Sequence, residues 1–489
     1  MPSPSSPVST NPHHARRWWI LALIGVAQLM VVLDATIVNI ALPSAQRALE
    51  FSDANRQWIV TAYALAFGSL LLIGGRIGDL FGRKQVFVVG LIGFAVASAI
   101  GGAAGSFGLL VFARALQGVF GALLAPAALS LLTTTFTDPA ERGRAFGIFG
   151  AIAGSGAAIG LLLGGILTEW LSWRWCLYVN LLFALPAAAA ALSLLHAQRH
   201  PDKPRVDVIG TLVSAVGLFA LVYGFAEAEQ DGWGAGTTIA FIAAGVVLLI
   251  VFAFLQTCSR SPLLPPRVVL DRDRGGAYLL LGVMGVGMFG VFLFLTYYLQ
   301  ATLGFSPIES GLAFLPVSAA ISIAAGLATA KLMGRFGHKP LMVIGMVLSA
   351  VGLAMLAQVS VDSSYATGVL PGLLVQGVGF GLVIAPAMAI AVIGVVPHEA
   401  GVASAMANTA QQVGGSIGIA LLSTLAASAT TGYVEDNGPQ AIAEAAVHGY
   451  TTAFWWSAGI FAVGAVLAAL MLKPGVKEAD PDAAPAMAH

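Results

Sequence analysis

The stretch GRIGDLFGRK, residues 75–84, is the most informative segment of this sequence. It lies between two apolar segments, each with about the length needed to cross a membrane. A degenerate copy of this segment occurs 255 positions later, where Phe336-Gly337-His338-Lys339 matches Phe81-Gly82-Arg83-Lys84. A short basic turn repeated between membrane helices indicates a duplicated membrane protein with moving parts.

This turn is a candidate gating loop on the cytoplasmic side. Its candidate residues are Gly75, Gly78, Asp79, Gly82, Arg83 and Lys84. Glycines allow a tight turn and a close approach of helices. Asp79 can cap a helix N-terminus, or pair with Arg142 or Arg144 of the next inner loop, and such contacts would break as a gate opens. The alternative is that Arg83 and Lys84 only anchor the topology by their positive charge.

The composition excludes an ordinary soluble protein. Of 489 residues, 58% are hydrophobic and only 9% are charged, and the mean hydropathy is +0.88. A soluble domain carries about 25% charged residues. The two cysteines, Cys176 and Cys258, fall in different apolar segments, and no metal-ligand spacing or phosphate-binding loop occurs. We therefore expect a membrane protein with no metal, no cofactor, no nucleic-acid partner and no ATP drive of its own.

Fourteen apolar segments are long enough to span the bilayer. They are residues 18–41, 57–75, 85–105, 107–133, 143–168, 174–195, 206–227, 236–256, 276–299, 309–332, 339–358, 366–391, 400–425 and 447–472. With the N-terminus in the cytoplasm, the inner segments carry 19 Lys and Arg residues and the outer segments three, while Arg114 lies inside a span. This asymmetry predicts a multi-pass protein of the cell inner (plasma) membrane with both termini cytoplasmic.

Two further landmarks recur at offsets of 258 to 260 positions. Residues 117–127 are echoed by residues 376–387, and Gly156 and Gly160 are echoed by Gly414 and Gly418. The copies fall in spans of the same direction, so the repeat is parallel, as in transporters that rock two halves about a central site. The sequence therefore predicts an all-α polytopic membrane protein with two parallel-related six-helix halves plus two inserted helices, 14 transmembrane helices in all.

The repeat and the spans together predict five parts. These are a cytoplasmic N-terminal tail (1–17), an N-terminal six-helix half (18–200), an inserted two-helix segment (201–260), a C-terminal six-helix half (261–473) and a cytoplasmic tail (474–489).

Asp34 is an acid deep in the first span. Such a residue costs several kcal/mol unless it is protonated, paired or hydrated, and it is a functional-site candidate for that reason. We interpret Asp34 as a proton-binding carboxylate that can also face a cationic substrate. The alternative is an acid that packs helices by bonding to Thr36 or another hydroxyl.

Arg114 lies in the fourth span, and Gln117 follows one turn later. Counted from the outer ends of their spans, Asp34 and Arg114 lie at depths of about 13 and 10 Å. The two residues can therefore meet, and we expect Asp34, Arg114 and Gln117 to couple protons to substrate. A permanent structural ion pair is the alternative. The second half has Leu373 near the equivalent position, so only one half is charged for coupling.

Two further groups have apolar roles. Gly156, Gly160 and Gly164 are spaced by four and share one helix face, which favours close helix packing over a nucleotide-binding run because no strand precedes them. Tyr63, Phe67, Met288, Phe292 and Tyr297 are candidates for a broad pocket for lipophilic compounds. Aromatic side chains that face lipid are the equal alternative for this second group.

With these residues in place, the chain resembles the major facilitator superfamily, and within it the fourteen-span drug:proton antiporter family. Residues 33–43 (LDATIVNIALP) resemble the first-helix signature of that family, and residues 75–84 resemble the loop signature of the superfamily. Residues 114–118 (RALQG) are similar to the fourth-helix motif associated with proton coupling, and SWRW at 172–175 with Asn180 is also family-like.

Two positions depart from the family pattern. Leu80 stands where many members have Arg, and Leu161 stands where the fifth-helix antiporter motif usually has Pro. The resemblance implies efflux of lipophilic, often cationic, compounds in exchange for protons, with the proton gradient as energy source. It implies a small lipophilic substrate, protons and the lipid bilayer as partners, and we expect a monomer.

Two other functions are alternatives to proton-coupled efflux. A proton-coupled symporter of a small solute is the nearer alternative, but nutrient uptake usually needs several polar site residues, and the spans offer mainly Asp34 and Arg114. An intramembrane enzyme is the other. No HExxH motif and no Ser/His/Asp set occurs, so we expect no enzyme.

Overall fold

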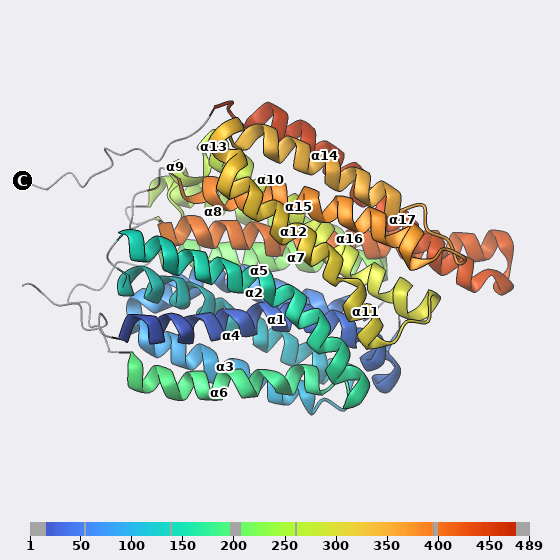
Figure 1. Cartoon of the computed structure of the whole chain (residues 1–489), viewed down its shortest axis with the longest axis horizontal. Helices are drawn as coiled ribbons and strands as arrows, with labels where there is room; N and C mark the ends of the chain where they lie inside the picture. Colours follow the sequence, from blue (N-terminus) through green and yellow to red (C-terminus); the bar gives the residue numbers. More distant parts are fainter. Residues whose placement is uncertain are drawn as a thin grey trace, which may run out of the picture.

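Helices form nearly all of the computed structural model, which describes residues 16–52, 55–136, 139–195, 207–259, 262–393, 395 and 400–475 (Figure 1). The first six are α1 (Arg17–Leu49), α2 (Gln57–Phe81), α3 (Arg83–Gly102), α4 (Phe107–Thr135), α5 (Pro139–Trp170) and α6 (Trp175–Leu194). An antiparallel pair follows, α7 (Val208–Asp231) and α8 (Gly236–Cys258). Most of the predicted tails, residues 1–15 and 476–489, lies outside the described residues.

The second half contains longer composite helices. After the short α9 (Pro266–Val269), α10 (Arg272–Tyr297) continues as a π-helical turn (Tyr298–Thr302). The next crossing is built from α11 (Pro307–Ala313), α12 (Leu315–Leu327), a second π-helical turn (Ala328–Leu332) and α13 (Met333–Phe336). The rest comprises α14 (His338–Leu356), a π-helical turn (Tyr365–Val369) leading into α15 (Leu370–Val392), α16 (Ala400–Asn437), a 3₁₀ turn (Pro439–Ala441) and α17 (Ile442–Met471).

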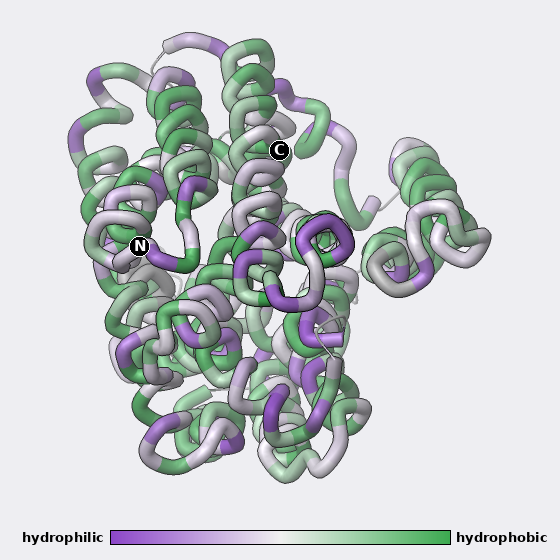
Figure 2. The backbone as a smooth tube through the Cα atoms, turned by 90° about the vertical axis from the view of Figure 1, so that its right-hand side faces the viewer, coloured by the Kyte–Doolittle hydropathy of each residue, from purple (hydrophilic) through white to green (hydrophobic). Residues whose placement is uncertain are grey.

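The expected all-helical, multi-span architecture is confirmed. Within the described residues, twelve helices are long and apolar enough to cross a membrane. The helices α2 and α5 have 25 and 32 residues, and their described residues include the shorter apolar stretches Gln57–Leu71 and Ala158–Trp170. Figure 2 shows hydrophobic colour along most of the helices and hydrophilic colour chiefly in the connections. By length and composition, the described part of the chain thus contains twelve candidate spans.

The helices of the two halves pack in the same pairs. In the first half α1 packs on α5, α2 and α3 pack on α4, and α3 packs on α6. In the second half α10 packs on α16, α12 and α14 pack on α15, and α14 packs on α17. The landmark prolines Pro126 and Pro386 lie inside the corresponding helices α4 and α15. The sequence repeat is therefore also a repeat of helix packing.

The repeated basic turn has the same backbone form in both copies. Gly82 joins α2 to α3 with φ +96°, and Gly337 joins α13 to α14 with φ +77°. Only glycine adopts this region without strain. Gly75 and Gly78 continue α2 as helical residues, so the turn itself is confined to Gly82.

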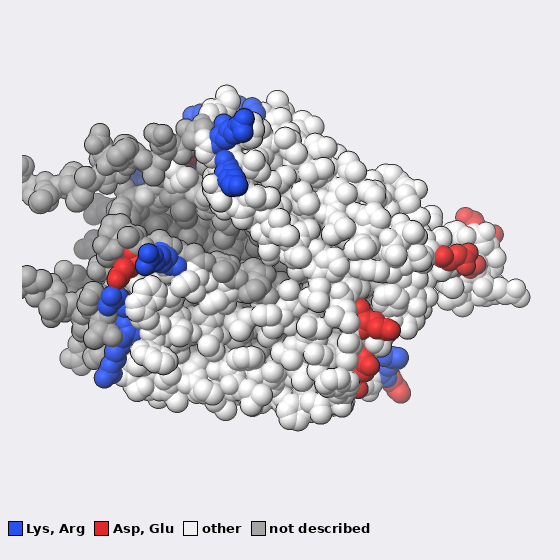
Figure 3. Space-filling model, in the orientation of Figure 1, with Lys and Arg blue, Asp and Glu red and all other residues white. Residues whose placement is uncertain are grey.

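The two ends of the molecule differ in charge. Figure 3 shows most visible Lys and Arg residues at the end where α1 begins, and most visible Asp and Glu residues at the opposite end. We call these the basic end and the far end.

The halves are joined at the far end by direct hydrogen bonds. The Tyr297 hydroxyl donates to Gln46 Oε1 over 2.6 Å, and Gln300 Nε2 donates to the Ile40 carbonyl over 3.1 Å. The backbone N–H of Ile308 donates to Glu169 Oε2 over 3.1 Å. The halves also pack along α2 with α16 and along α5 with α11, while α7 contacts both α2 and α16. The far end is therefore closed in this conformation.

Candidate functional site

The carboxylate of Asp34 lies at the centre of a buried polar network in the first half. Its side chain is fully buried, and Arg114 Nη1 donates to Asp34 Oδ2 over 2.6 Å. Gln117 Nε2 and Asn180 Nδ2 both donate to Asp34 Oδ1, over 2.9 and 2.6 Å. The Thr36 hydroxyl instead donates to the carbonyls of its own helix. Asp34 is thus held by three side chains from α4 and α6, and not by Thr36.

Arg114, like Asp34, makes several hydrogen bonds within the first half. Its Nε donates to the Ile59 carbonyl on α2 over 3.1 Å, and its Nη1 also contacts Gln117 Oε1 at 2.8 Å. Gln117 Nε2 donates in turn to the Ser98 hydroxyl on α3 over 2.8 Å. A buried ion pair needs such extra bonds, because taking both charges out of water costs free energy. The predicted meeting of Asp34, Arg114 and Gln117 is therefore present in the structure.

An aromatic stack supports the guanidinium. The Arg114 Cζ lies 4.5 Å from the centre of the Tyr63 ring, and Tyr63 stacks on Phe67 with ring centroids 5.7 Å apart. A cation above an aromatic face is attracted by the ring quadrupole. Tyr63 and Phe67 are almost fully buried, so in this conformation they support the ion pair.

Glycines bring α5 against α1 beside Asp34. A Cβ on Gly160 would lie 2.1 Å from Thr36 Oγ1 and 3.0 Å from the Leu33 carbonyl oxygen. A Cβ on Gly164 would lie 2.9 Å from the Ile37 carbonyl oxygen, while one on Gly156 would meet only side chains, at 3.1 Å or more. In the second half Gly414 and Gly418 approach the α10 backbone at Gly282 and Val286 in the same way. The geometry agrees with the predicted packing role.

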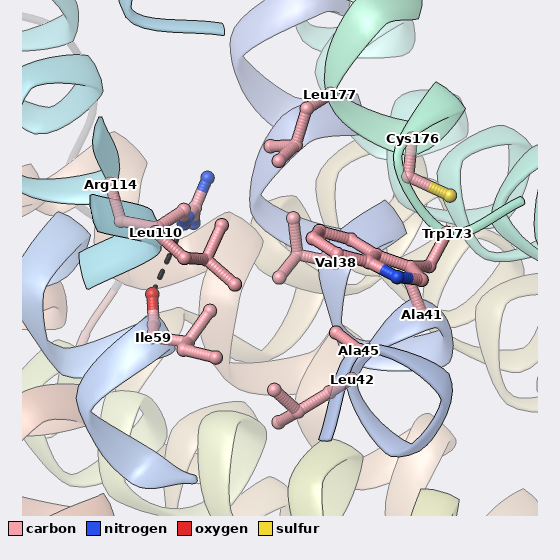
Figure 4. Close-up of a pocket in the computed structure, with 10 residues that line it drawn as sticks. All are labelled: Val38, Ala41, Leu42, Ala45, Ile59, Leu110, Arg114, Trp173, Cys176 and Leu177. Atoms are coloured by element: carbon pink, nitrogen blue, oxygen red, sulfur yellow. Dashed lines mark hydrogen bonds between the residues drawn. The ribbon is translucent and has the colours of Figure 1, made fainter. Parts of the chain in front are cut away.

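A small cavity of about 10 Å³ borders Arg114 (Figure 4). Its lining is mostly apolar and comprises Val38, Ala41, Leu42, Ala45, Ile59, Leu110, Arg114, Trp173, Cys176 and Leu177. This volume suits about one water molecule, whereas drug-sized ligands need about 300–1,000 Å³. The cavity is therefore too small for a lipophilic substrate.

The five predicted pocket residues lie in separate places. Tyr63 and Phe67 belong to the ion-pair site, and none of the five lines the small cavity. Phe292 packs against Phe314 with ring centroids 5.2 Å apart, and Met288 Sδ lies 4.0 Å from Gln411 Nε2. Tyr297 bonds Gln46 and lies under the Arg56 guanidinium, 4.1 Å from ring centre to Cζ. In this conformation Tyr297 is part of the closed far end.

The basic turn holds neighbouring elements together. Lys84 Nζ donates to the carbonyls of Leu192 and Leu195 over 2.7 and 2.6 Å, at the C-terminus of α6, where a cation is favoured. Arg76 Nη2 donates to the Pro262 carbonyl over 3.1 Å, which ties α2 to the segment before α9. The side chains of Asp79 and Arg142 lie outside the described residues, as does any pairing between them.

Two homologous helical bundles, with one buried ion pair in the first, are the arrangement of a secondary transporter. The model of the Major Facilitator Superfamily matches residues 24–419, and the chain belongs to this family. A puromycin resistance protein of Streptomyces alboniger is 50% identical over 95% of this chain and 93% of its own length. A cephamycin export protein of Amycolatopsis lactamdurans is 37% identical over 84% and 85%, respectively.

A solved peptide transporter of the POT family, described as auto-inhibited, has the same fold. It is 16% identical, covers 93% of this chain and 96% of its own, and superimposes with a TM-score of 0.69. Membership of the superfamily makes the protein a multi-span transporter and not an enzyme. Its relatives include antibiotic export and resistance proteins.

Proposed function

We propose that this protein exports lipophilic, cationic compounds in exchange for protons by alternating access. The observation that carries the proposal is the full burial of Asp34 with Arg114, Gln117 and Asn180 as its hydrogen-bond donors. A carboxylate in such a place is either paired or protonated. Proton binding therefore competes with Arg114 for the same oxygen atoms.

Helix α1 connects the protonation site at Asp34 to the contacts that close the far end. A neutral Asp34 holds Arg114 less strongly, so the contact between α1 and α4 weakens when the proton arrives. The same helix carries Ile40 and Gln46, which bond Gln300 and Tyr297 across the halves at the far end. We infer that protonation of Asp34 biases the closure of the far end through α1.

The finer membrane arrangement is part of the proposal. We infer that α2 and α5 also cross the membrane, because they have 25 and 32 residues and lie between spans, which gives fourteen spans and the drug:proton antiporter subfamily. The basic end is assigned to the cytoplasm by its Lys and Arg residues. Both termini then lie on the inner side of the cell membrane, and the protein works as a monomer without a cofactor.

Cationic substrates are inferred from the site and from the relatives. Asp34 is a fully buried acid of the first half, and a positive compound can take the place of Arg114 or of the proton beside it. The puromycin resistance protein suggests puromycin, which carries a basic amine, as a first compound to test. Export is the proposed direction although Leu161 replaces the motif proline, since export and resistance proteins are among the relatives.

Everted membrane vesicles test the proposal directly. Wild type and Asp34→Asn are compared for uptake of puromycin and of ethidium while the vesicle interior is acidified. We expect wild-type uptake that collapses with an uncoupler and is lost in Asp34→Asn. Uptake that survives the substitution would remove Asp34 from coupling, and transport only in the opposite direction would identify a symporter.

A further inference from the structure

Seven buried polar atoms without a hydrogen-bond partner among the described residues lie on α2 and α16, which pack together across the two halves. One of them is the hydroxyl of Tyr63, whose ring lies beside Arg114, and the other six are amide or aliphatic hydroxyl atoms. Of these six, the ones on α2 are both amide atoms of Gln57 and the hydroxyl of Thr61. On α16 they are the hydroxyls of Thr409 and Ser423 and Oε1 of Gln412. None of these atoms has a partner among the described residues. We call these five residues the polar seam.

The register of the two helices places these groups opposite one another. A Cβ on Gly68 would lie 3.2 Å from the Gln412 Cβ, which fixes one point of contact. The helices are antiparallel, since α2 starts at the far end and α16 ends there (Figure 1). Gln57 lies eleven residues before Gly68, and Ser423 lies eleven after Gln412. Eleven residues are about three turns, or about 16 Å, so both side chains return to the facing sides at one level near the far end.

Thr61 belongs to the same face of α2. It precedes Gly68 by seven residues, about two turns, and its side chain is fully buried. The neighbouring Trp58 points elsewhere, toward Tyr223 of α7, with ring centroids 5.7 Å apart. On α2, Gln57 and Thr61 therefore lie along the contact between the halves and not along the contact with the inserted pair.

Groups of this kind are expensive to leave buried and dry. A buried polar atom without a partner costs free energy, and most such atoms in proteins are paired. The adjacent Thr424 follows the rule, because its hydroxyl donates to the Ala420 carbonyl over 2.9 Å. A strip of unpaired groups at a closed contact is explained if the contact opens and the groups find partners there.

The chemistry of the seam limits its partners. Residues 57–71 of α2 and 402–434 of α16 contain no charged residue. Amides and hydroxyls offer both donors and acceptors without charge. They suit hydroxyl, amide and carbonyl groups of a ligand, whereas Asp34 suits a positive charge.

We propose that the polar seam lines the exit path of the substrate once the far end has opened, and binds the uncharged hydrogen-bonding groups of the exported compound. The proposal rests on the proposed function, because it requires export by alternating access. It adds a second contact to the coupling site. Asp34 responds to the charge of the compound, and Gln57, Thr61 and Ser423 hold its neutral polar groups before release.

Cysteine labelling from outside tests this inference. Ser423→Cys and Thr61→Cys are made in a Cys258→Ser background, in which the remaining Cys176 is fully buried. Thr237→Cys, at the exposed start of α8 near the far end, serves as the control. Right-side-out vesicles are treated with a membrane-impermeant maleimide, with and without external puromycin. Transport by each variant is measured in parallel, so that loss of the proposed function is seen separately.

We expect the maleimide to label Ser423→Cys and Thr61→Cys, and puromycin to slow that labelling at least fivefold without affecting Thr237→Cys. A transport-competent Ser423→Cys that is never labelled would overturn the exposure of the seam. Labelling that puromycin does not slow at either seam position would overturn its role in binding. If a cysteine variant does not transport, Ser423→Ala replaces it. Puromycin transport by Ser423→Ala should then show a KM at least threefold higher than that of Thr424→Val, and an unchanged KM would overturn the proposal.

Discussion

The Nη1 atom of Arg114 lies 2.6 Å from the Oδ2 atom of Asp34, and both side chains are enclosed by helices of the first half. Neither charge has a counterpart in the second half, where Leu373 occupies the place that corresponds to Arg114. The two halves are thus alike in packing and unlike in electrostatics. Under the proposed function, the first half carries the group that binds the proton, and the second half supplies the surface against which it moves.

Removing Arg114 should harm folding more than removing the whole pair. Arg114→Leu leaves the Asp34 carboxylate buried without its cation, which we expect to lower the unfolding free energy by about 3–5 kcal/mol. The double variant Asp34→Asn with Arg114→Leu should recover most of that loss, since no charge remains buried. Denaturant unfolding in detergent measures both. A double variant as unstable as Arg114→Leu would mean that the ion pair is not the source of the loss.

Asn180 should matter as a hydrogen-bond donor to Asp34. Asn180→Leu removes the 2.6 Å bond to Oδ1, and bonds to charged groups contribute about 1.5–3 kcal/mol. Asn39→Leu is the matched control, because Asn39 is equally buried but donates only to the Ala35 carbonyl of its own helix. We expect Asn180→Leu to cost more stability and to impair proton-driven uptake, with Asn39→Leu close to wild type. Equal effects would contradict the assignment.

The glycine face of α5 should be sensitive at one position and tolerant at another. Gly160→Ala places a methyl group 2.1 Å from Thr36 Oγ1 and against the α1 backbone, so α5 must shift away from the helix that carries Asp34. Overpacking of this kind costs about 1–3 kcal/mol. Gly156→Ala meets only the movable side chains of Leu29 and Val32 and should cost less. Thermal unfolding and vesicle transport of the two variants test the difference.

The turn between α2 and α3 should need glycine at Gly82 only. Gly82→Ala forces a side chain into a backbone conformation at φ +96°, at an expected cost of about 1–3 kcal/mol. Gly78→Ala sits inside α2 with open space around its Cβ and should stabilise the helix by about 0.5–1 kcal/mol. Comparable destabilisation by both would show that the turn extends back to Gly78. Membrane levels and unfolding midpoints of the two proteins provide the measurement.

The sequence predicts the helical architecture well, because long apolar segments and the positive-inside asymmetry are strong signals. The internal repeat also predicts which helices correspond, as Pro126 with Pro386 and Gly82 with Gly337 illustrate. Similar depths in the membrane allow Asp34 and Arg114 to meet. Depth does not give rotation about the helix axis, so contacts at right angles to it are less predictable.

The contacts of Asn180 and Ser98 could not be predicted from the sequence. Asn180 stands out as a polar residue in an apolar helix, but its contact with Asp34 depends on how α6 is turned toward α1. Ser98 carries no signal, since serine is common in packed membrane helices. Tyr63 and Phe67 are predicted for a substrate pocket, and in this conformation they stack beneath Arg114. An aromatic residue that lines a pocket and one that supports an ion pair have the same pattern in sequence.

In the proposed mechanism, substrate and proton compete for Asp34. The most direct test adds puromycin to purified protein in weakly buffered detergent solution near neutral pH, and follows proton release with a pH indicator. We predict a burst of protons from wild type that saturates with binding, and none from Asp34→Asn, which still binds the compound. Proton release of the same size from Asp34→Asn, or saturable binding to wild type without release at any pH between 5 and 8, would contradict the account.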